Sequence, residues 1–302
     1  MQVYHYKFGE ALPKASSVLA LGFFDGVHLA HRRLLDLARD IAAREGLPFG
    51  VFTFSSDGNV KRGVSRIYTD EEKLSLLEEL GADFTVLAHF PSISGLSPEE
   101  FVSEVLIREA GAKIAVAGFN FRFGKGASGD CNDLTRLLSL HGARAVIADE
   151  ITLGARTVSS SLIRRLLTEG DIVEANRLLV RPYSLSGVVS HGDGRGKALG
   201  FPTLNTALAP ERVIPRLGVY RSEVVIDGVA YRALTNVGRC PTLGERAAHA
   251  ETHLLNFSGA IYGEKINVSL FEFLRDEMIF ENAESLKAQI ARDIAAAFKE
   301  EK

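Results

Sequence analysis

The chain has 302 residues, which is enough for about two domains that each bury a core of their own. Its 35 basic and 38 acidic residues nearly balance at a net charge of −3, so the composition shows no basic surface for nucleic acid or for an anionic membrane. Hydrophobic residues make up 46% and charged residues 24%, which is ordinary for a globular protein and excludes a fibrous or disordered chain.

The first half of the chain alternates between strand-like and helix-like stretches. Short apolar runs predict strands at 18–24, 49–54, 83–87, 113–118 and 143–148. Apolar residues at helical spacing or capping residues predict helices at 29–44, at 70–80, from about 97, and at 130–140. Alternation of this length predicts a parallel sheet with helices on both faces, in which ligands bind beyond the carboxyl ends of the strands.

Two histidines, His28 and His31, follow the first predicted strand at the start of its helix. Residues three apart on a helix are neighbours, so both imidazoles can face one anion beside the positive end of the helix dipole. A pair of histidines without a functional role would explain the same spacing. A zinc site is less well supported, because no third ligand stands at a useful spacing.

A second polar feature is the start of the helix predicted after Val158. Ser160 stands at this start and Arg164 follows one turn later. Hydroxyls at a helix N-terminus with a cation nearby can hold a phosphate, although helix capping alone equally explains the serines.

These stretches together resemble the N-terminal module of the bacterial bifunctional riboflavin kinase/FAD synthetases, which are adenylyltransferases of the His-x-Gly-His superfamily. The matching segments are Gly22-x-Phe-Asp-Gly-Val-His28-x-x-His31, Gly118-Phe-Asn120-Phe-Arg-Phe-Gly124 and Ser159-Ser160-x-x-Ile-Arg164. The resemblance implies an α/β Rossmann-like nucleotidyltransferase domain in which the FMN phosphate attacks the α-phosphorus of ATP.

The same resemblance implies the roles of individual residues in that module. His28 and His31 would stabilise the charge that develops during the transfer, together with Mg²⁺. The residues that it assigns to nucleotide or phosphate binding are Gly22, Asp25, Gly26, Asn120, Ser160 and Arg164.

The chain departs from the family pattern at three places. Ala30 stands where the family has the glycine of His-x-Gly-His, and Thr157 stands where it often has arginine. Residues 53–58 read Thr-Phe-Ser-Ser-Asp-Gly in place of Thr-Phe-Asp-Pro-His-Pro. These departures leave an alternative open, in which the N-terminal module is degenerate and the chain is a monofunctional riboflavin kinase.

The second half of the chain contains mostly strand-like stretches. After a predicted helix at 171–180, which Arg181-Pro182 ends, β-rich runs are expected at 183–190, 218–226, 231–237, 249–257 and 266–274. Asp227-Gly228 is typical of a hairpin turn, and a last amphipathic helix is expected at 283–298. The pattern predicts a small antiparallel β-barrel domain with a C-terminal helix, and hence domains at 1–181 and 182–302.

A glycine-rich stretch at 192–205 carries the second candidate phosphate site. Its glycines, at 192, 194, 196 and 200, would let backbone N–H groups approach an anion beside Arg195 and Lys197. Thr203 and Asn205 share one face of an extended segment and offer the hard oxygens that suit Mg²⁺. It is not a Walker A loop, because Ala198 follows the lysine. A flexible surface loop is the alternative.

Three polar side chains alternate along a predicted strand at His249, Glu251 and His253. They project from one face, which fits a metal site or, more commonly, a solvated polar face. The segments Gly200-Phe-Pro-Thr-Leu-Asn205, Asn236-Val-Gly-x-x-Pro-Thr242 and Glu251-Thr-His-Leu-Leu-Asn256 resemble those of riboflavin kinases.

That second resemblance implies a kinase in which Glu251 is the catalytic base for the ribityl hydroxyl as it attacks the γ-phosphorus of ATP. Thr203 and Asn205 would hold Mg²⁺ and the ATP phosphates, and Arg275 would lie beside the flavin. The residues of the flap over the nucleotide would be Gly192, Gly194, Lys197 and Gly200.

We therefore expect an enzyme that makes FMN from riboflavin and FAD from FMN, using ATP and Mg²⁺. A flavin-binding protein without turnover is an alternative of another class. The sequence has no secretory signal or membrane-length apolar run, and its two cysteines lie far apart. These features predict a cytoplasmic protein, and the balanced charge predicts no nucleic-acid or membrane partners. We expect small-molecule substrates and a monomer or weak homo-oligomer.

Overall fold

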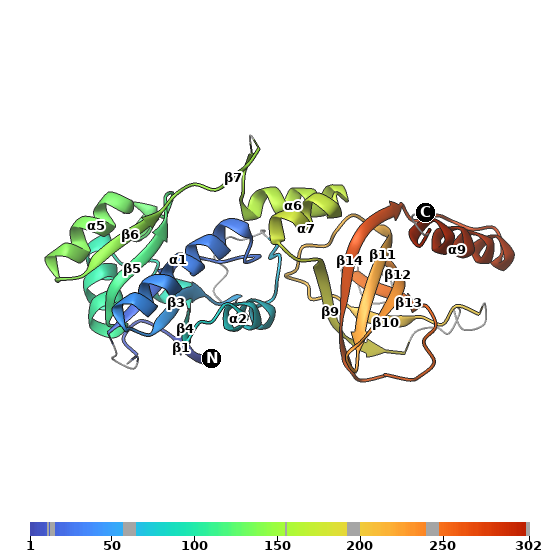
Figure 1. Cartoon of the computed structure of the whole chain (residues 1–302), viewed down its shortest axis with the longest axis horizontal. Helices are drawn as coiled ribbons and strands as arrows, with labels where there is room; N and C mark the ends of the chain where they lie inside the picture. The colour runs from blue at the N-terminus through green and yellow to red at the C-terminus, as the bar shows by residue number, and fades with distance from the viewer. Residues whose placement is uncertain are drawn as a thin grey trace. The chain divides into compact units, whose positions relative to one another are not determined.

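The structure is a computed structural model that describes residues 1–10, 12, 16–56, 65–154, 156–191, 200–239 and 248–299. Its contacts divide the chain into two compact units, Met1–Ser160 and Ser161–Lys302, and each is described by itself (Figure 1). The domain boundary expected at 181/182 stays a prediction. Within the described residues, no helix is both long enough and apolar enough to cross a membrane.

The first unit is built on a six-stranded sheet with the order β1-β4-β3-β2-β5-β6, in which every neighbouring pair is parallel. The strands are β1 (Gln2–Tyr6), β2 (Ser17–Leu21), β3 (Phe49–Phe54), β4 (Phe84–Ala88), β5 (Ala112–Gly118) and β6 (Arg144–Ala148). Every residue of β2 and β3 is buried, as expected for parallel strands covered on both faces.

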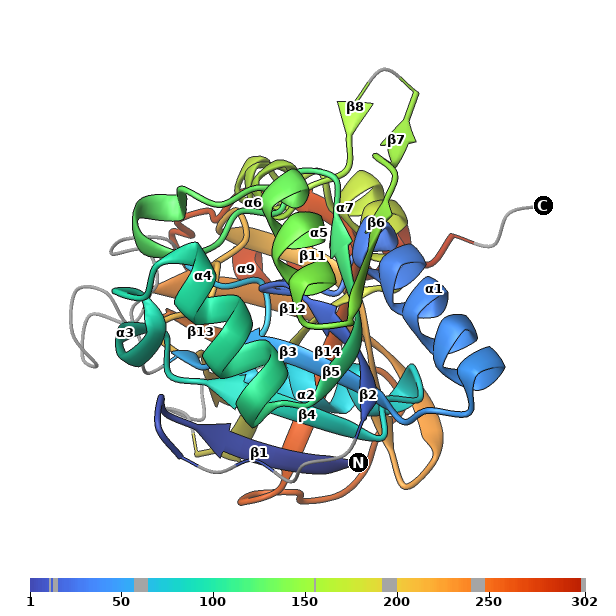
Figure 2. The same cartoon turned by 90° about the vertical axis from the view of Figure 1, so that its left-hand side faces the viewer.

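Helices cover both faces of this sheet, with α1 on one side and α5 on the other (Figure 2). They are α1 (Leu29–Glu45), α2 (Asp70–Glu79), the short α3 (Phe90–Ile93) and α4 (Pro98–Glu100), the π-helical η2 (Phe101–Glu109) and α5 (Cys131–Leu140). Capping boxes begin three of them, at Thr69, Ser97 and Asp130, because each of these side chains satisfies an N–H group that the first turn leaves unpaired.

Three small elements complete this unit. The 3₁₀ turn η3 (Lys125–Ala127) follows the loop after β5. The strands β7 (Thr152–Leu153) and β8 (Arg156–Thr157) pair antiparallel just before the helix that begins at Ser160.

The second unit contains a closed antiparallel barrel with the strand order β10-β13-β12-β11-β14-β9. The strands are β9 (Tyr183–Ser190), β10 (Leu204–Ala207), β11 (Gly218–Ile226), β12 (Val229–Arg239), β13 (Ala248–Leu254) and β14 (Lys265–Arg275). Its helices are α6 (Ser160–Glu169), which begins at the last residue of the first unit, α7 (Ile172–Leu179) and α9 (Ala283–Ala297).

The barrel interior includes a chain of buried hydroxyls. Thr235 bonds Ser222 at 2.7 Å and Thr252 at 3.0 Å, so three neighbouring strands are joined through their inner faces as well as through their backbones. Arg212 is also buried, at 1% exposure, and donates to the carbonyl of Ser184 at 2.9 Å. Burial of these polar groups is compatible with stability because each has a hydrogen-bond partner.

The predicted fold class is confirmed. The strand expected at 49–54 and the helix expected from Leu29 match β3 and α1, and Asp227 and Gly228 adopt the positive φ angles, 50° and 78°, that a hairpin turn of this kind requires. The edge strand β1 and the paired strands β7 and β8 were not predicted, and the helix expected from residue 97 becomes π-helical at Phe101.

Candidate active sites

The first candidate site lies at the carboxyl ends of β2 and β5. From β2 the chain passes through α1 to β3 on one side, whereas β5 pairs with β2 on the other side. This reversal of strand order opens a crevice in which parallel sheets bind ligands. The loop that carries Gly22, Asp25 and Gly26 follows β2, and the loop that carries Asn120 follows β5.

The structure brings His28 and His31 together at the start of α1. His28 is the N-cap residue, and its Nδ1 accepts a hydrogen bond from the N–H of His31 at 3.4 Å, which places the proton of a neutral His28 on Nε2. The two rings stack with their centroids 3.6 Å apart and an angle of 13° between their planes. His28 is buried and His31 is half-buried.

The surroundings of His31 disfavour the charged form of its imidazole. Burial, and then the neighbouring imidazole of His28, hold the pKa of His31 well below its usual range. Its Nδ1 is buried and has no hydrogen-bond partner among the residues that the structure describes. A buried imidazole nitrogen without a partner is costly unless a ligand supplies one.

Asp25 ties the loop after β2 to two other segments. Its Oδ1 accepts a hydrogen bond from the N–H of Ile67 at 2.9 Å. The carbonyl oxygen of Asp25 accepts one from Oγ of Ser160 at 2.8 Å. Thr53 adds a third link, because its hydroxyl donates to the carbonyl of Phe23 at 2.9 Å. Hydrogen bonds from β3, from the segment before α2 and from the first residue of α6 therefore fix the shape of this loop.

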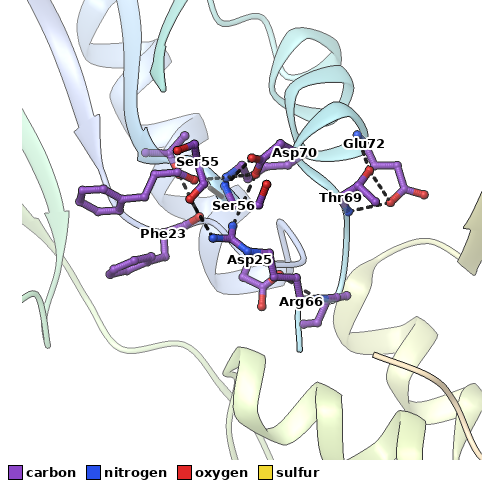
Figure 3. Close-up of polar contacts among 12 residues, drawn as sticks. Phe23, Asp25, Ser55, Ser56, Arg66, Thr69, Asp70 and Glu72 are labelled. Carbon is purple, nitrogen blue, oxygen red and sulfur yellow. Dashed lines mark hydrogen bonds and ion pairs between the residues drawn. The ribbon is translucent and has the colours of Figure 1, made fainter. Parts of the chain in front are cut away.

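Charged side chains hold Ser55 and Ser56, which lie in the segment where the sequence departs from the family pattern. Asp70 Oδ2 accepts a hydrogen bond from the N–H of Ser56 at 2.5 Å, and Arg66 donates to the carbonyl of Ser55 at 2.9 Å (Figure 3). Arg66 and Asp70 are themselves paired at 3.4 Å. Residues 57–64, which follow Ser56, lie outside the described residues.

Lys73 is buried beneath this cluster, with only 2% of its surface exposed. Its Nζ donates to the carbonyl of Phe54 at 2.7 Å and lies 3.2 Å from Oδ1 of Asp70. Burial lowers the pKa of Lys73, although Asp70 opposes this shift. Burial by itself would raise the pKa of Asp70, but the charge of Lys73 and the N–H of Ser56 outweigh it, and that pKa is lowered.

Asn120 lies beside a shallow cavity at the carboxyl end of β5. The cavity has a volume of about 440 Å³ and is lined by Phe119, Asn120, Phe121, Arg122, Asp130, Cys131 and Asn132. Asn120 is exposed there, so its amide can contact a ligand. Ser160 and Arg164 lie on α6, with the hydroxyl of Ser160 directed to the loop after β2.

The second candidate site lies on the outer face of the barrel. Along β13, Ala250, Thr252 and Leu254 are buried, whereas Glu251 and the alternating histidines are only half-buried. Glu251 is the register partner of Asn205 on β10 and of Asn236 on β12. Register partners in antiparallel strands project from the same face, so these three side chains form one row, and Thr203 immediately precedes β10.

The two histidines of β13 contact different groups. His249 Nε2 lies 3.0 Å from Oε1 of Glu251, whereas His253 Nδ1 lies 2.9 Å from the carbonyl oxygen of Pro202. His253 also packs edge-on against the ring of Phe201. In the described part of the chain, no group of three histidine, cysteine or acidic residues could hold a metal ion.

Other predicted residues are placed as follows. Gly200 has a φ of +87°, which glycine adopts readily and other residues rarely do. Gly192, Gly194 and Lys197 lie outside the described residues, as does the Pro241-Thr242 end of the second kinase motif.

Arg275 forms an ion pair that the sequence did not predict. Its guanidinium donates to the carboxylate of Asp293 on α9 at 2.8 to 3.1 Å and to the carbonyl of Asp276 at 2.9 Å. The side chain of Arg275 is 18% exposed and that of Asp293 is 7% exposed. Arg275 thus holds the C-terminal helix, and its role beside a flavin stays a prediction.

Two residues of this site were not identified as site residues from the sequence. Asn236 belongs to a matched motif, but only the strand register shows that it lies beside Glu251. His249 was considered as a metal ligand or a structural residue, whereas the structure shows it paired with Glu251.

Comparisons with known proteins find a matching family for each half of the chain. A family model described as FAD synthetase matches residues 11–162, and one described as riboflavin kinase matches residues 179–300. A protein of Listeria monocytogenes named bifunctional riboflavin kinase/FMN adenylyltransferase is 35% identical over 92% of this chain and 90% of its own length. Proteins of the same name from Bacillus subtilis and Escherichia coli K12 are 34% and 33% identical, covering 95% and 93% of this chain and 93% and 91% of their own lengths.

A solved structure confirms the architecture over the whole chain. It is described as a macrolide-efflux protein from Streptococcus pneumoniae and superposes with a TM-score of 0.86. Its sequence is 28% identical, and the match covers 99% of this chain and 100% of that one.

Proposed function

This chain belongs to the bifunctional riboflavin kinase/FMN adenylyltransferase family, and from that premise we propose which of its residues carry each reaction. The chain phosphorylates riboflavin to FMN with ATP, and it adenylylates FMN to FAD with release of pyrophosphate. The match of the FAD synthetase model to residues 11–162 favours both activities over a kinase alone.

We assign the kinase to residues 182–302 and the adenylyltransferase to residues 1–181. In the kinase, Glu251 takes the proton of the ribityl hydroxyl while that oxygen attacks the γ-phosphorus of ATP. The observation that carries this assignment is the register that sets Asn205, Glu251 and Asn236 side by side on the outer face of the barrel. Substrates can reach this row because Glu251 is 43% exposed there.

Thr203 and Asn205 would hold Mg²⁺ at this site. A hydroxyl and an amide oxygen are hard ligands, and they leave room for the waters and phosphate oxygens that complete an octahedral shell. When bound, the ion would neutralise charge on the ATP phosphates. The segment with Gly192, Gly194, Lys197 and Gly200 would cover the nucleotide.

Arg275 is assigned to the flavin side of the same row. It is the register partner of Val219, which is in turn the partner of Asn236. The ion pair with Asp293 would keep its guanidinium fixed, so its contribution to flavin binding would be a rigid wall and a nearby positive charge.

In the adenylyltransferase, no protein nucleophile is needed. An oxygen of the FMN phosphate attacks the α-phosphorus of ATP in line, and pyrophosphate leaves. We assign His28, His31, Ser160 and Arg164 to the stabilisation of developing charge, and Asn120 to the ATP phosphates. The imidazole of His31 can act as a hydrogen-bond donor, and its buried Nδ1, which has no partner among the described residues, supports a ligand contact at this position.

Gly22, Asp25 and Gly26 complete the nucleotide site by shaping the loop after β2. Since the carbonyl and carboxylate of Asp25 are engaged by Ser160 and Ile67, the contacts of this loop with phosphate would come from its backbone N–H groups. We further propose a cytoplasmic location and a monomer or weak homo-oligomer. The nearly balanced charge supports the absence of nucleic-acid or membrane partners.

Two variants test these assignments against each other. Glu251→Gln should lower the rate of FMN formation about 10²–10⁴-fold, because an amide cannot take the proton, while FAD formation from added FMN continues. His28→Ala should lower the rate of FAD formation from added FMN, while FMN formation from riboflavin continues. Glu223→Gln, which alters another half-buried glutamate on the outer face of the barrel, is the matched control and should keep both rates. A Glu251→Gln rate near that of the wild type would remove the assignment of the base.

A further inference from the structure

His249 occupies a central place in the polar row of the kinase site. It lies on β13 between its register partners Ala207 on β10 and Gly238 on β12, two residues along the strands from Asn205, Glu251 and Asn236. Because alternate residues of a strand share a face, its imidazole projects from the barrel on the same side as Glu251.

The contact between these side chains has the geometry of a hydrogen bond. Nε2 of His249 lies 3.0 Å from Oε1 of Glu251. An ionised carboxylate can only accept, so Nε2 carries the hydrogen whether the imidazole is neutral or protonated. The side chain of His249 is 16% exposed and that of Glu251 is 43% exposed, so the donor is largely covered by protein while the side chain of the acceptor reaches the surface.

Gly238 on the neighbouring strand β12 lies beside this imidazole. A Cβ at Gly238 would stand 3.5 Å from Cε1 of His249, an ordinary van der Waals distance, and only 2.6 Å from Oε1 of Glu277, so a side chain here would crowd Glu277. The amide of Asn236 lies within 3.5 Å of the same point. His249, Asn236 and Glu277 thus lie together over Gly238, and only the close approach of Glu277 depends on glycine at this position.

We propose that His249 is a positioning residue of the riboflavin kinase reaction, an inference that rests on the proposed role of Glu251 as the base. The hydrogen bond from Nε2 fixes Oε1 and so sets the direction in which the carboxylate meets the ribityl hydroxyl. The hydroxyl proton passes to Glu251, the hydroxyl oxygen bonds to the γ-phosphorus, and the bond from that phosphorus to the leaving ADP oxygen breaks. His249 neither gains nor loses a proton in this step.

The hydrogen bond affects the rate because a base works only within a narrow range of distance and angle. A misplacement of about 1 Å at a reacting group can cost about 10²-fold in rate. An unrestrained glutamate side chain has several rotamers of similar energy, and the imidazole selects one of them. The effect should therefore appear in kcat, whereas the KM values for riboflavin and ATP should change little.

The test compares two substitutions at this position. His249→Gln keeps an amide N–H that can reach Oε1, whereas His249→Leu has a similar size and no donor. With the full chain, riboflavin, ATP and Mg²⁺, we expect kcat for FMN formation to stay within about threefold of wild type in the first variant and to fall about 10–100-fold in the second. FAD formation from added FMN and the thermal unfolding midpoint monitor folding, and His249→Ala replaces the leucine variant if that variant does not fold.

The outcomes separate the two proposals. If Glu251→Gln loses FMN formation but His249→Leu keeps a kcat near wild type, the positioning role is wrong and the base assignment stands. Equal losses of kcat in the glutamine and leucine variants would also overturn the donor role, as would a change confined to KM. If Glu251→Gln itself keeps the wild-type rate, the base assignment fails, and the positioning role fails with it.

Discussion

Substitution of Asp70 by asparagine isolates the buried charge cluster at the end of β3. Asparagine can still accept the hydrogen bond from the N–H of Ser56, but it removes the negative charge that faces Lys73 at 3.2 Å and Arg66 at 3.4 Å. Arg66 remains 18% exposed, so water can solvate it, whereas Lys73 is only 3% exposed at its side chain. The main cost is therefore an uncompensated ammonium group in the protein interior.

The magnitude follows from the burial of Lys73. Removing one partner of a buried ion pair costs about 3–5 kcal/mol, and we expect about 3 kcal/mol here because Lys73 keeps its bond to the carbonyl of Phe54. For a unit of this size, such a loss corresponds to a fall in Tm of about 6–12 °C. A double variant, Asp70→Asn with Lys73→Met, should recover much of the loss, since the buried charge is then gone.

Calorimetry of the full chain, with the four proteins of this double-mutant cycle at neutral pH, measures the effect. The transition of the first unit should move in Asp70→Asn, and the transition of the barrel unit should not. FMN formation serves as the control for the barrel, because its residues lie in the other unit. A Tm shift below about 2 °C, or a double variant that is less stable than Asp70→Asn, would refute the reasoning that Lys73 depends on Asp70.

Three further predictions follow from particular residues. The pKa of Asp70 is lowered from 3.8, so its ionisation stabilises the fold fully above pH 3.8, and this stabilisation is lost as the pH falls through the folded-state pKa. The difference in unfolding free energy between wild type and Asp70→Asn should therefore shrink in that range. A difference that stays constant during acid unfolding would contradict this. Gly218→Ala should lower the unfolding free energy of the barrel by at least about 2 kcal/mol, because φ at this residue is +144° and the new Cβ would stand 2.2 Å from the carbonyl oxygen of Arg275. An unchanged Tm would count against this prediction. Ala30→Gly should raise the rate of FAD formation if the methyl group crowds the nucleotide, whereas an unchanged rate would show that it does not limit this module.

The sequence predicted the helices and strands whose own residues favour the structure that they adopt. The strand at 49–54 is apolar throughout, and the helix after Thr69 begins with a residue that caps it, so periodicity and local chemistry were sufficient. The segment 2–6 mixes polar and aromatic residues, and it becomes a strand through its parallel pairing with β4, which no local pattern reveals.

The sites show the same division between local and non-local information. The spacing of His28 and His31 indicated that they are neighbours, but their stacking and the lowered pKa of His31 depend on burial. The row that joins Asn205 to Glu251 exists only through strand register. The burial of Lys73 in a polar first turn could not be anticipated, because its partners lie on β3 and at the start of the same helix.

The most direct test of the proposed function is a single incubation of the full chain with riboflavin, ATP and Mg²⁺, followed by chromatographic separation of the flavins. Two active modules predict that riboflavin is converted to FMN and that FAD appears after it. FMN without FAD would contradict the adenylyltransferase, and the absence of both products would contradict the enzyme as a whole.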